Sequence, residues 1–250
     1  MPKQHSQDLP FSPEADLDEL VHQAESRYPV HFETVTIGST ALQILQIRDM
    51  EAYIEDLASR TSFGQELSLP FWAKIWPTSL LLGHILEAKY PVADLDVLEI
   101  GSGVGLCGLV AAAKGARVTL SDTHPDALLF GRINALKNGL QDRVRVACVD
   151  FTTDRLQERF QRIIGSEVLY KEAVYTHVVD FLAHHLISGP GAEVLLAKSH
   201  HFKATTFYQR VTQVFEVQER SLGYKEQNPA SGTPERHVCH ILRLRPLPHV

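Results

Sequence analysis

The stretch Val97-Leu98-Glu99-Ile100-Gly101-Ser102-Gly103-Val104-Gly105-Leu106 places three alternating glycines directly after an apolar strand pattern and before a helical one. Glycine is required where a backbone turns sharply and approaches a ligand more closely than a Cβ would allow. Asp122 ends the next strand-like run, about twenty residues after the glycines, the spacing at which an acidic side chain meets a ribose hydroxyl. Gly101, Gly103, Gly105 and Asp122 together predict a site for an adenosine-containing cofactor.

The register of the glycines indicates which cofactor this is. The segment from Gly103 to Gly108 also matches the dinucleotide pattern G-x-G-x-x-G. In that motif, however, the first glycine directly follows the strand, and Gly101 holds that place here. Glu99 at the strand end would repel a pyrophosphate and attract a cationic ligand. S-adenosylmethionine carries a sulfonium and an ammonium, so it is favoured over a nicotinamide dinucleotide or a glycine turn without a ligand.

Composition limits the class of protein. The 250 residues suffice for one large α/β domain with an appendage, and 44% hydrophobic with 22% charged residues is ordinary for a globular protein. A net charge of −6 offers no large basic surface, so we expect no nucleic-acid partner. The three cysteines are widely separated and favour neither a disulfide framework nor a metal cluster. No signal-peptide core or membrane span is evident, so we expect a cytoplasmic protein without membrane contact.

The chain divides into an N-terminal extension, residues 1–65, and a main domain, residues 66–250. In the extension we expect a helix over 13–28, a β-hairpin over 30–47 and a helix over 50–60. Beyond it, strands and helices alternate, which builds a parallel sheet with crossover helices. The expected strands are 97–101, 117–122, 143–149, 160–165 and 192–197, and the expected helices are 104–114, 125–138, 171–185 and 203–215. Two closing strands, 220–224 and 238–244, have no helix between them.

This pattern predicts an α/β fold with a Rossmann-like, seven-stranded, mostly parallel sheet and an antiparallel C-terminal edge. In such a sheet the ligand crevice lies beyond the carboxyl ends of the strands. Asp150 and Phe151 follow the third strand, where a carboxylate can accept from an adenine amino group and a ring can stack on the base. A turn cap beside a core phenylalanine is the alternative. Asp122 likewise has an alternative role as the cap of the helix that begins near Pro125.

Aromatic and acidic residues mark two further positions. The segment Pro70–Pro77 holds both tryptophans of the chain, and Trp76 beside Pro77 is a candidate lid over a flat ligand, with core packing as the alternative. Glu167 and Tyr170 follow the fourth strand, where a carboxylate attracts an ammonium and an aromatic ring adds cation–π contact. A helix-terminal acid and a packed tyrosine are the alternative there.

Histidine pairs do not indicate a metal site. His184 and His185 are adjacent on one expected helix and point in different directions, and no Cys or carboxylate cluster completes a ligand set. We therefore expect no metal. His200 and His201 follow the fifth strand, where they are candidates for contacts at the substrate rim.

Three segments of this chain resemble the seven-β-strand protein lysine methyltransferases of methyltransferase family 16. They are Phe71-Trp72-Ala73-Lys74-Ile75-Trp76-Pro77, Leu98-Glu99-Ile100-Gly101-Ser102-Gly103-Val104-Gly105 and Glu167-Val168-Leu169-Tyr170. The likeness runs from about Pro70 to Leu186. It implies that S-adenosylmethionine is lined by Trp76, Gly101, Gly103, Asp122, Phe151 and Ser166, and that Glu167 and Tyr170 meet the target amine. Relatives often carry Asp in place of Glu167 and Trp in place of Phe151.

The resemblance implies methyl transfer from S-adenosylmethionine to a side-chain amine of another protein, with lysine as the first candidate. Protein histidine or arginine and small amines are alternative acceptors. An Asn-Pro-Pro-Tyr motif is absent at the fourth strand, which disfavours glutamine, adenine and cytosine. A nicotinamide-dependent oxidoreductase and a noncatalytic cofactor-binding adaptor remain as other classes. The hairpin over 30–47 either docks the protein substrate or covers the fold.

Overall fold

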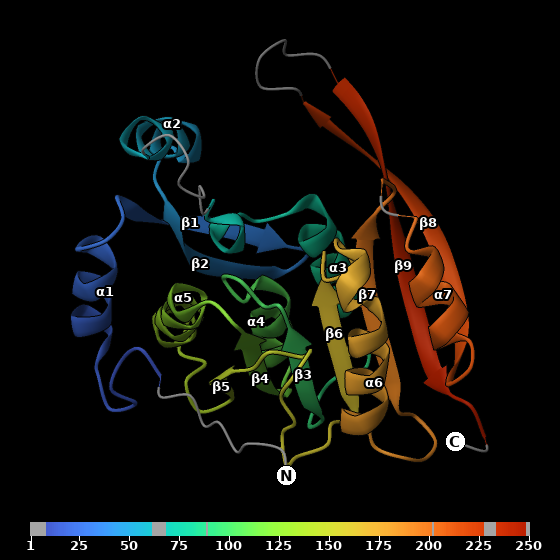
Figure 1. Ribbon diagram of the computed structural model, residues 1–250. Coiled ribbons are helices and arrows are strands. Elements are labelled where there is room, and N and C mark those ends of the chain that lie inside the picture. The colour runs from blue at the N-terminus through green and yellow to red at the C-terminus, as the bar shows by residue number, and fades with distance from the viewer. Residues whose placement is uncertain (1–8, 62–68, 89, 202, 228–233, 249–250) are drawn as a thin grey trace.

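The computed structural model describes residues 9–61, 69–88, 90–201, 203–227 and 234–248. Its central element is a seven-stranded sheet in the order β5-β4-β3-β6-β7-β9-β8 (Figure 1). The strands are β3 (Asp96–Ile100), β4 (Arg117–Asp122), β5 (Val144–Cys148), β6 (Arg162–Ser166), β7 (Glu193–Ser199), β8 (Phe215–Gln227) and β9 (Pro234–Pro246). The first five strands in this order, β5, β4, β3, β6 and β7, run parallel to one another. Strand β9 is antiparallel to both of its neighbours, β7 and β8. The predicted fold class is confirmed.

Helices cover both faces of the sheet (Figure 1). They are α3 (Pro77–Ala88), α4 (Leu106–Ala113), α5 (Pro125–Lys137), α6 (Tyr175–His185) and α7 (Thr205–Val211), with short 3₁₀ turns η1 (Phe71–Ala73) and η2 (Glu172–Val174). Because successive strand residues point to opposite faces, Val97 of β3 packs in the core under α4 and α5, and Leu98 packs in the core under α6. In the described ranges, no helix combines the length and apolarity needed to cross a membrane.

The N-terminal extension packs on the main domain. It contains α1 (Leu17–Glu25), β1 (Val30–Ile37), β2 (Thr40–Ile47) and α2 (Met50–Arg60). β1 and β2 form the predicted hairpin, paired along its whole length around the turn at Gly38 and Ser39. The buried side chains of Ile37, Ile44 and Leu45 belong to the same core as those of α4 and α5. The hairpin thereby covers one face of the fold.

Two asparagines of α5 attach this hairpin to the main domain. The side chain of Asn134 is fully buried, accepts from the Leu45 N–H at 2.7 Å and donates to the Val104 carbonyl at 3.0 Å. Asn138 accepts from the N–H of Gln43 and donates to its carbonyl, each at 2.8 Å. These hydrogen bonds satisfy backbone N–H and carbonyl groups along the edge of β2 that faces away from β1. Through Asn134, the hairpin is also linked to the glycine turn.

The C-terminal strands are longer than predicted. The sequence pattern indicates a helix over 203–215 and strands over 220–224 and 238–244, whereas α7 ends at Val211 and β8 begins at Phe215. β8 and β9 pair from Phe215 opposite Pro246 to Gln227 opposite Pro234. The ladder bonds satisfy the backbone whatever the side chains are, so a charged stretch without apolar alternation enters the strand. Because β7 pairs with β9 only as far as Cys239, the remaining ribbon projects beyond the sheet (Figure 1).

Candidate active site

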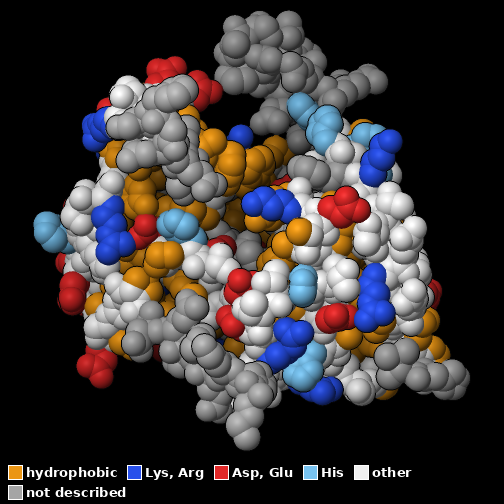
Figure 2. Space-filling view, in the orientation of Figure 1, with side chains coloured by type: hydrophobic (Ala, Val, Ile, Leu, Met, Phe, Trp, Pro, Cys, Tyr) orange, Lys and Arg blue, Asp and Glu red, His pale blue; other side chains and the backbone are white. Residues whose placement is uncertain are grey.

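The carboxyl ends of the parallel strands meet at one edge, on a side of the molecule where hydrophobic side chains line a hollow (Figure 2). The glycine turn after β3 lies at this edge. Gly101, Gly103 and Gly105 all have positive φ angles, of 58°, 52° and 82°. A Cβ on Gly103 would lie 2.5 Å from the Trp72 carbonyl oxygen. Only glycine therefore fits at Gly103, both in backbone conformation and in space.

Asp122, at the end of β4, is bonded to the glycine turn. Its Oδ2 accepts from the Gly103 N–H at 2.9 Å, and its Oδ1 accepts from the His124 N–H at 2.9 Å. The carboxylate thus joins the turns that follow β3 and β4. Each oxygen keeps a second lone pair with which it can accept from a ribose hydroxyl, and that role stays a prediction.

Glu99 lies in the interior beneath α4. Strand alternation turns its side chain to the α4 face, where Oε2 accepts from the Gly108 N–H at 2.7 Å and the residue is only 3% exposed. Burial raises the pKa of its carboxyl to about 8. This placement gives Glu99 a structural role at the start of α4. The predicted attraction of a cationic cofactor by Glu99 stays a prediction.

Replacing Glu99 with glutamine is expected to stabilise the fold more at alkaline than at acidic pH. A carboxyl whose pKa rises from 4.5 to about 8 on folding favours the folded state at low pH, and this contribution is lost as pH rises through 8. Glutamine keeps the acceptor for Gly108 and carries no charge. The melting temperature of Glu99→Gln relative to wild type should rise by at least about 3 °C between pH about 5 and about 8.5. A difference that does not vary with pH contradicts this role.

The two tryptophans have different surroundings. Trp72 packs edge-on against Phe130 at 4.9 Å between ring centroids and stacks on His124 at 5.0 Å, so its ring packs against the core. Trp76 is half-buried directly before α3, and its Nε1 donates to the Phe71 carbonyl at 3.1 Å. The Lys74 ammonium lies 4.8 Å from its ring centroid. Trp76 is therefore the tryptophan available for the predicted cofactor contact.

Asp150 and Phe151 adopt the turn arrangement that the sequence left as the alternative. The Asp150 carboxylate accepts from the N–H and the hydroxyl of Thr152, at 2.8 and 2.6 Å. Phe151 lies edge-on to Phe181, with 6.4 Å between ring centroids. These contacts account for both residues structurally, and their contact with adenine stays a prediction.

Glu167 follows β6 in a strained backbone conformation. Its φ of 55° is unusual for a residue with a Cβ, and such strain often accompanies functional sites. Its N–H donates to the Ala197 carbonyl at 2.9 Å, while its carboxylate accepts from the Thr78 hydroxyl and the Ser199 N–H. Burial, the largest effect, raises the pKa of Glu167, and Lys198 is among the groups that oppose this rise.

Ser166 and Tyr170 flank this carboxylate differently. The Ser166 hydroxyl donates to Thr78 Oγ1 at 2.9 Å, and the Thr78 hydroxyl in turn donates to the Glu167 carboxylate. Tyr170 is 50% exposed, and the Lys171 ammonium lies 5.4 Å from its ring centroid. The structure therefore brings Ser166 and Glu167 together through Thr78 and places Tyr170 at the surface. The role of Tyr170 toward an amine stays a prediction.

Two residues near Glu167 were absent from the predicted site. Thr78 is buried at the start of α3, and a hydroxyl two residues after Trp76 has no sequence signal of its own. Lys198 is buried near the end of β7, and desolvation lowers its pKa. A lysine that directly follows the apolar run Val194–Ala197 is the signal that could have pointed to it.

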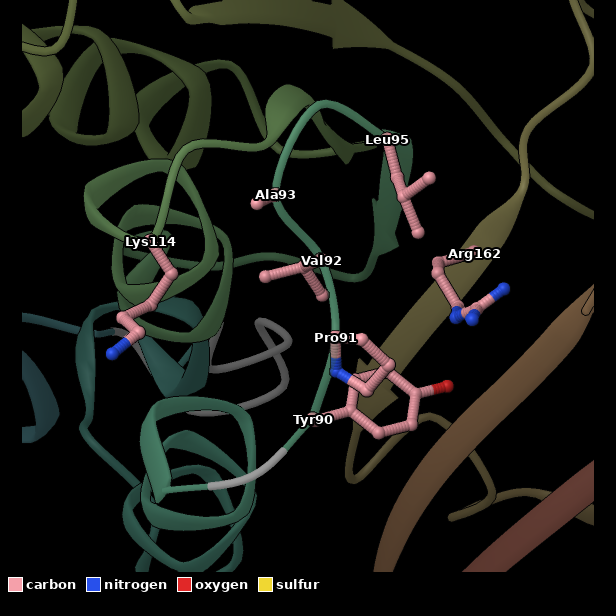
Figure 3. Close-up of a pocket in the computed structure, with 7 residues that line it drawn as sticks. All are labelled: Tyr90, Pro91, Val92, Ala93, Leu95, Lys114 and Arg162. Carbon is pink, nitrogen blue, oxygen red and sulfur yellow. The ribbon is translucent and has the colours of Figure 1, made fainter.

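A separate cavity of about 460 Å³ lies at the opposite edge of the sheet (Figure 3). Its lining residues are Tyr90, Pro91, Val92, Ala93, Leu95, Lys114 and Arg162. The Tyr90 hydroxyl donates to Glu193 at 2.7 Å, and the Arg162 guanidinium lies over the Tyr90 ring at 5.5 Å. Since ligands of open α/β sheets bind at the carboxyl ends of the strands, the edge with Glu167 and the glycine turn is the candidate active site.

Comparison with known proteins identifies the family of this chain. A protein-family model described as lysine methyltransferase matches residues 62–214 of the sequence, which is more than half of the chain. The protein N-lysine methyltransferase METTL21A of Danio rerio is 32% identical over 154 residues, which are 59% of this chain and 70% of that protein. A histidine protein methyltransferase 1 homolog of Dictyostelium discoideum is 29% identical over 135 residues, 52% of this chain and 43% of that protein.

The fold also matches solved structures. The N-methyltransferase NodS of Bradyrhizobium japonicum, solved with S-adenosyl-L-homocysteine, superposes with a TM-score of 0.53 at 17% identity, over 80% of this chain and 99% of that one. At this identity the likeness concerns the fold alone. From the extent of the family match, the chain belongs to the lysine methyltransferase family and is an S-adenosylmethionine-dependent methyltransferase.

Proposed function

We propose that this chain transfers a methyl group from S-adenosylmethionine to the side-chain amine of a lysine in another protein. The observation that carries the proposal is the carboxylate of Glu167, which is held by Thr78 and Ser199 next to the strand that bears the glycine turn. A carboxylate in this position attracts an incoming ammonium. The family description and the name of the Danio rerio relative favour the same acceptor.

The glycine turn fits the adenosyl cofactor. Gly101 is exposed at the carboxyl edge of the sheet, and its missing Cβ leaves open a position 2.9 Å from Val168 Cγ1. Asp122 would hold the ribose, and Trp76 and Ser166 would line the remaining surface. When bound, S-adenosylmethionine supplies a methyl group attached to a positively charged sulfonium. The sulfur is the leaving group and becomes a neutral thioether when the methyl group is transferred.

Glu167 orients the target amine and retains it electrostatically. Glutamate and lysine differ by about six pKa units in their ordinary values, or roughly 8 kcal/mol at about 1.36 kcal/mol per unit. A direct proton transfer from the ammonium to this carboxylate is therefore unfavourable. The buried Thr78 hydroxyl and the Ser199 amide keep the carboxylate in one orientation.

Histidine is the second candidate acceptor, because the Dictyostelium discoideum relative is named as a histidine protein methyltransferase. Histidine presents a ring nitrogen where lysine presents an ammonium, so it gains less from a neighbouring carboxylate. The partly buried carboxylate of Glu167 thus favours lysine.

The proposal is tested by incubating the protein with isotope-labelled S-adenosylmethionine and a host-cell lysate, then mapping the labelled residues by mass spectrometry. We expect the label on lysine side chains of one or a few proteins. Label on histidine or arginine contradicts the lysine assignment. Label on small amines alone, or none in a sample that binds the cofactor, contradicts the proposal as a whole.

We further propose that the exposed face of the hairpin docks the protein substrate. Since Asn134 links β2 to the glycine turn, deleting the hairpin would also disturb the cofactor site. The exposed residue Thr36 of β1 offers a cleaner change. Thr36→Lys is expected to lower methylation of the protein target at least about threefold while the affinity for S-adenosylmethionine stays unchanged.

The matched control is Asn134→Ala, which should weaken cofactor binding because it removes the hydrogen bond to Val104. Methylation rate and cofactor affinity are measured on both variants. Full methylation of the protein target by Thr36→Lys would leave the hairpin with its covering role alone.

A further inference from the structure

A line of hydrogen-bonded side chains runs from β8 to the rim of the candidate active site. Glu219 Oε1 lies 2.5 Å from His240 Nδ1, and His240 Nε2 lies 2.8 Å from His200 Nδ1. A carboxylate only accepts, so His240 donates from Nδ1 and accepts at Nε2. His200 then donates from Nδ1, and its Nε2 remains an acceptor on an exposed residue.

Neighbouring groups hold this line in place. The Tyr208 hydroxyl of α7 donates to Glu219 Oε2 at 2.7 Å, and the Ser221 hydroxyl of β8 lies 3.2 Å from His240 Nδ1. Lys198 of β7 pairs with His240 across the sheet and interacts electrostatically with Glu219. Each member therefore has a defined orientation, as a proton-transfer chain requires.

The line ends at His200, between two residues that interact with Glu167. The Ser199 N–H donates to the Glu167 carboxylate, and His200 is the next residue. The His200 N–H donates to the Val238 carbonyl at 3.1 Å, which fixes this part of the chain to β9. His201 interacts electrostatically with Glu167 from the same loop. His200 thus lies between two residues that interact with Glu167, at the end of β7, where an amine held by Glu167 would approach.

A metal site does not account for these histidines. Within the described ranges, no group of three or more His, Cys, Asp or Glu is arranged to hold a metal ion. His240 has both ring nitrogens in hydrogen bonds, so neither is available to a metal. The linear order of carboxylate, imidazole and imidazole is instead the arrangement of a base oriented by a second and a third group.

We propose that His200, oriented by His240 and Glu219, accepts the proton that the target ammonium must lose before methyl transfer. The inference rests on the proposed function. In this step the N–H bond of the ammonium breaks, a new N–H bond forms at His200 Nε2, and the electron pair stays on the amine. That pair then forms the bond to the methyl carbon, and the carbon–sulfur bond breaks with its pair on sulfur. The imidazolium loses its proton to water.

The need for such a group follows from the acceptor. With an ordinary pKa of about 10.4, fewer than about one lysine in a thousand is neutral at pH 7. Glu167 attracts the ammonium and by itself favours the protonated form. An imidazole, with an ordinary pKa of about 6.5, is closer to lysine than a carboxylate is by about two pKa units, so the uphill proton transfer is smaller. A positioned imidazole typically contributes about 100-fold or more to a rate.

The first test measures the initial rate of label transfer from S-adenosylmethionine to lysate protein between pH about 6.5 and about 10. His200→Gln should be slower than wild type by at least about 30-fold near pH 7, and the deficit should shrink toward pH 10 as solvent deprotonates the lysine. His177→Gln, on the exposed side of α6, is the matched control and should follow wild type.

The second test reads the positions of the protons directly. Nitrogen chemical shifts of the histidine rings should show Nδ1 protonated in both His240 and His200. Glu219→Gln should slow methyl transfer near pH 7, but by less than His200→Gln does, because His200 keeps its imidazole and only the charge at the end of the line is removed. An unchanged rate would remove Glu219 from this role.

The outcomes are distinguishable. A deficit of His200→Gln that is equal at every pH, or no deficit, overturns the inference while the proposed function stands. His240 protonated at Nε2 overturns it as well. A wild type that binds S-adenosylmethionine but labels no protein overturns the proposed function, and the inference with it.

Discussion

Replacing Gly101 with arginine is expected to abolish binding of S-adenosylmethionine and of its demethylated product. The φ of Gly101 is 58°, and a Cβ there would lie 2.9 Å from Val168 Cγ1. Arginine therefore adds backbone strain and places a long cationic side chain where a cationic ligand would lie. Isothermal titration calorimetry should show an affinity at least about 100-fold weaker, or roughly 2.7 kcal/mol.

The matched control for this change is Gly139→Arg. Gly139 has a similar φ of 67°, but nothing lies within 4 Å of its added Cβ. The control therefore carries the same backbone strain without crowding the crevice, and it should bind the cofactor like wild type. Both variants are checked for folding by circular dichroism. Wild-type affinity in a folded Gly101→Arg protein would remove the glycine turn from the cofactor site.

Replacing Glu167 with glutamine is expected to lower turnover at least about 100-fold while cofactor affinity stays within about twofold of wild type. Glutamine keeps the size of the side chain and its acceptor for the Ser199 amide, but removes the charge that orients the ammonium. Single-turnover transfer of a labelled methyl group and calorimetric titration measure the two effects separately. Glu167→Asp should recover part of the rate because it restores the charge.

Glu172→Gln serves as the control for this second change. Glu172 is an exposed carboxylate on η2, five positions along the chain, and it accepts from the Thr206 hydroxyl at 2.6 Å. It should turn over like wild type. If Glu167→Gln and Glu172→Gln have equal activity, Glu167 takes no part in the reaction.

The sequence alone determined those features whose causes are local. The apolar strand followed by three glycines predicts a sharp turn, and the structure has it, with positive φ angles at Gly101, Gly103 and Gly105. Alternating side chains around Gly38 and Ser39 predict the hairpin, which pairs in full register. These features depend on residues close together in the chain, so their periodicity and conformational preferences are sufficient to predict them.

Only the tertiary structure decided which partners the polar side chains have. Glu99 lies on the α4 face and bonds to Gly108, and Asp122 bonds to the turn of the preceding strand. Thr78 reaches Glu167 from a segment almost ninety residues earlier in the chain. No local pattern encodes such pairings, because they depend on how distant strands and helices pack.

The hydrogen-bonded side chains Glu219, His240 and His200 show the same difference between local and long-range causes. The sequence placed His200 after a strand, where it was a candidate for contact at the substrate rim. His240 and Glu219 became its partners only because β9 pairs with β7 on one side and with β8 on the other. The sequence by itself therefore determined the fold class and the glycine turn, while the packing of distant strands and helices decided which side chains surround Glu167 and His200.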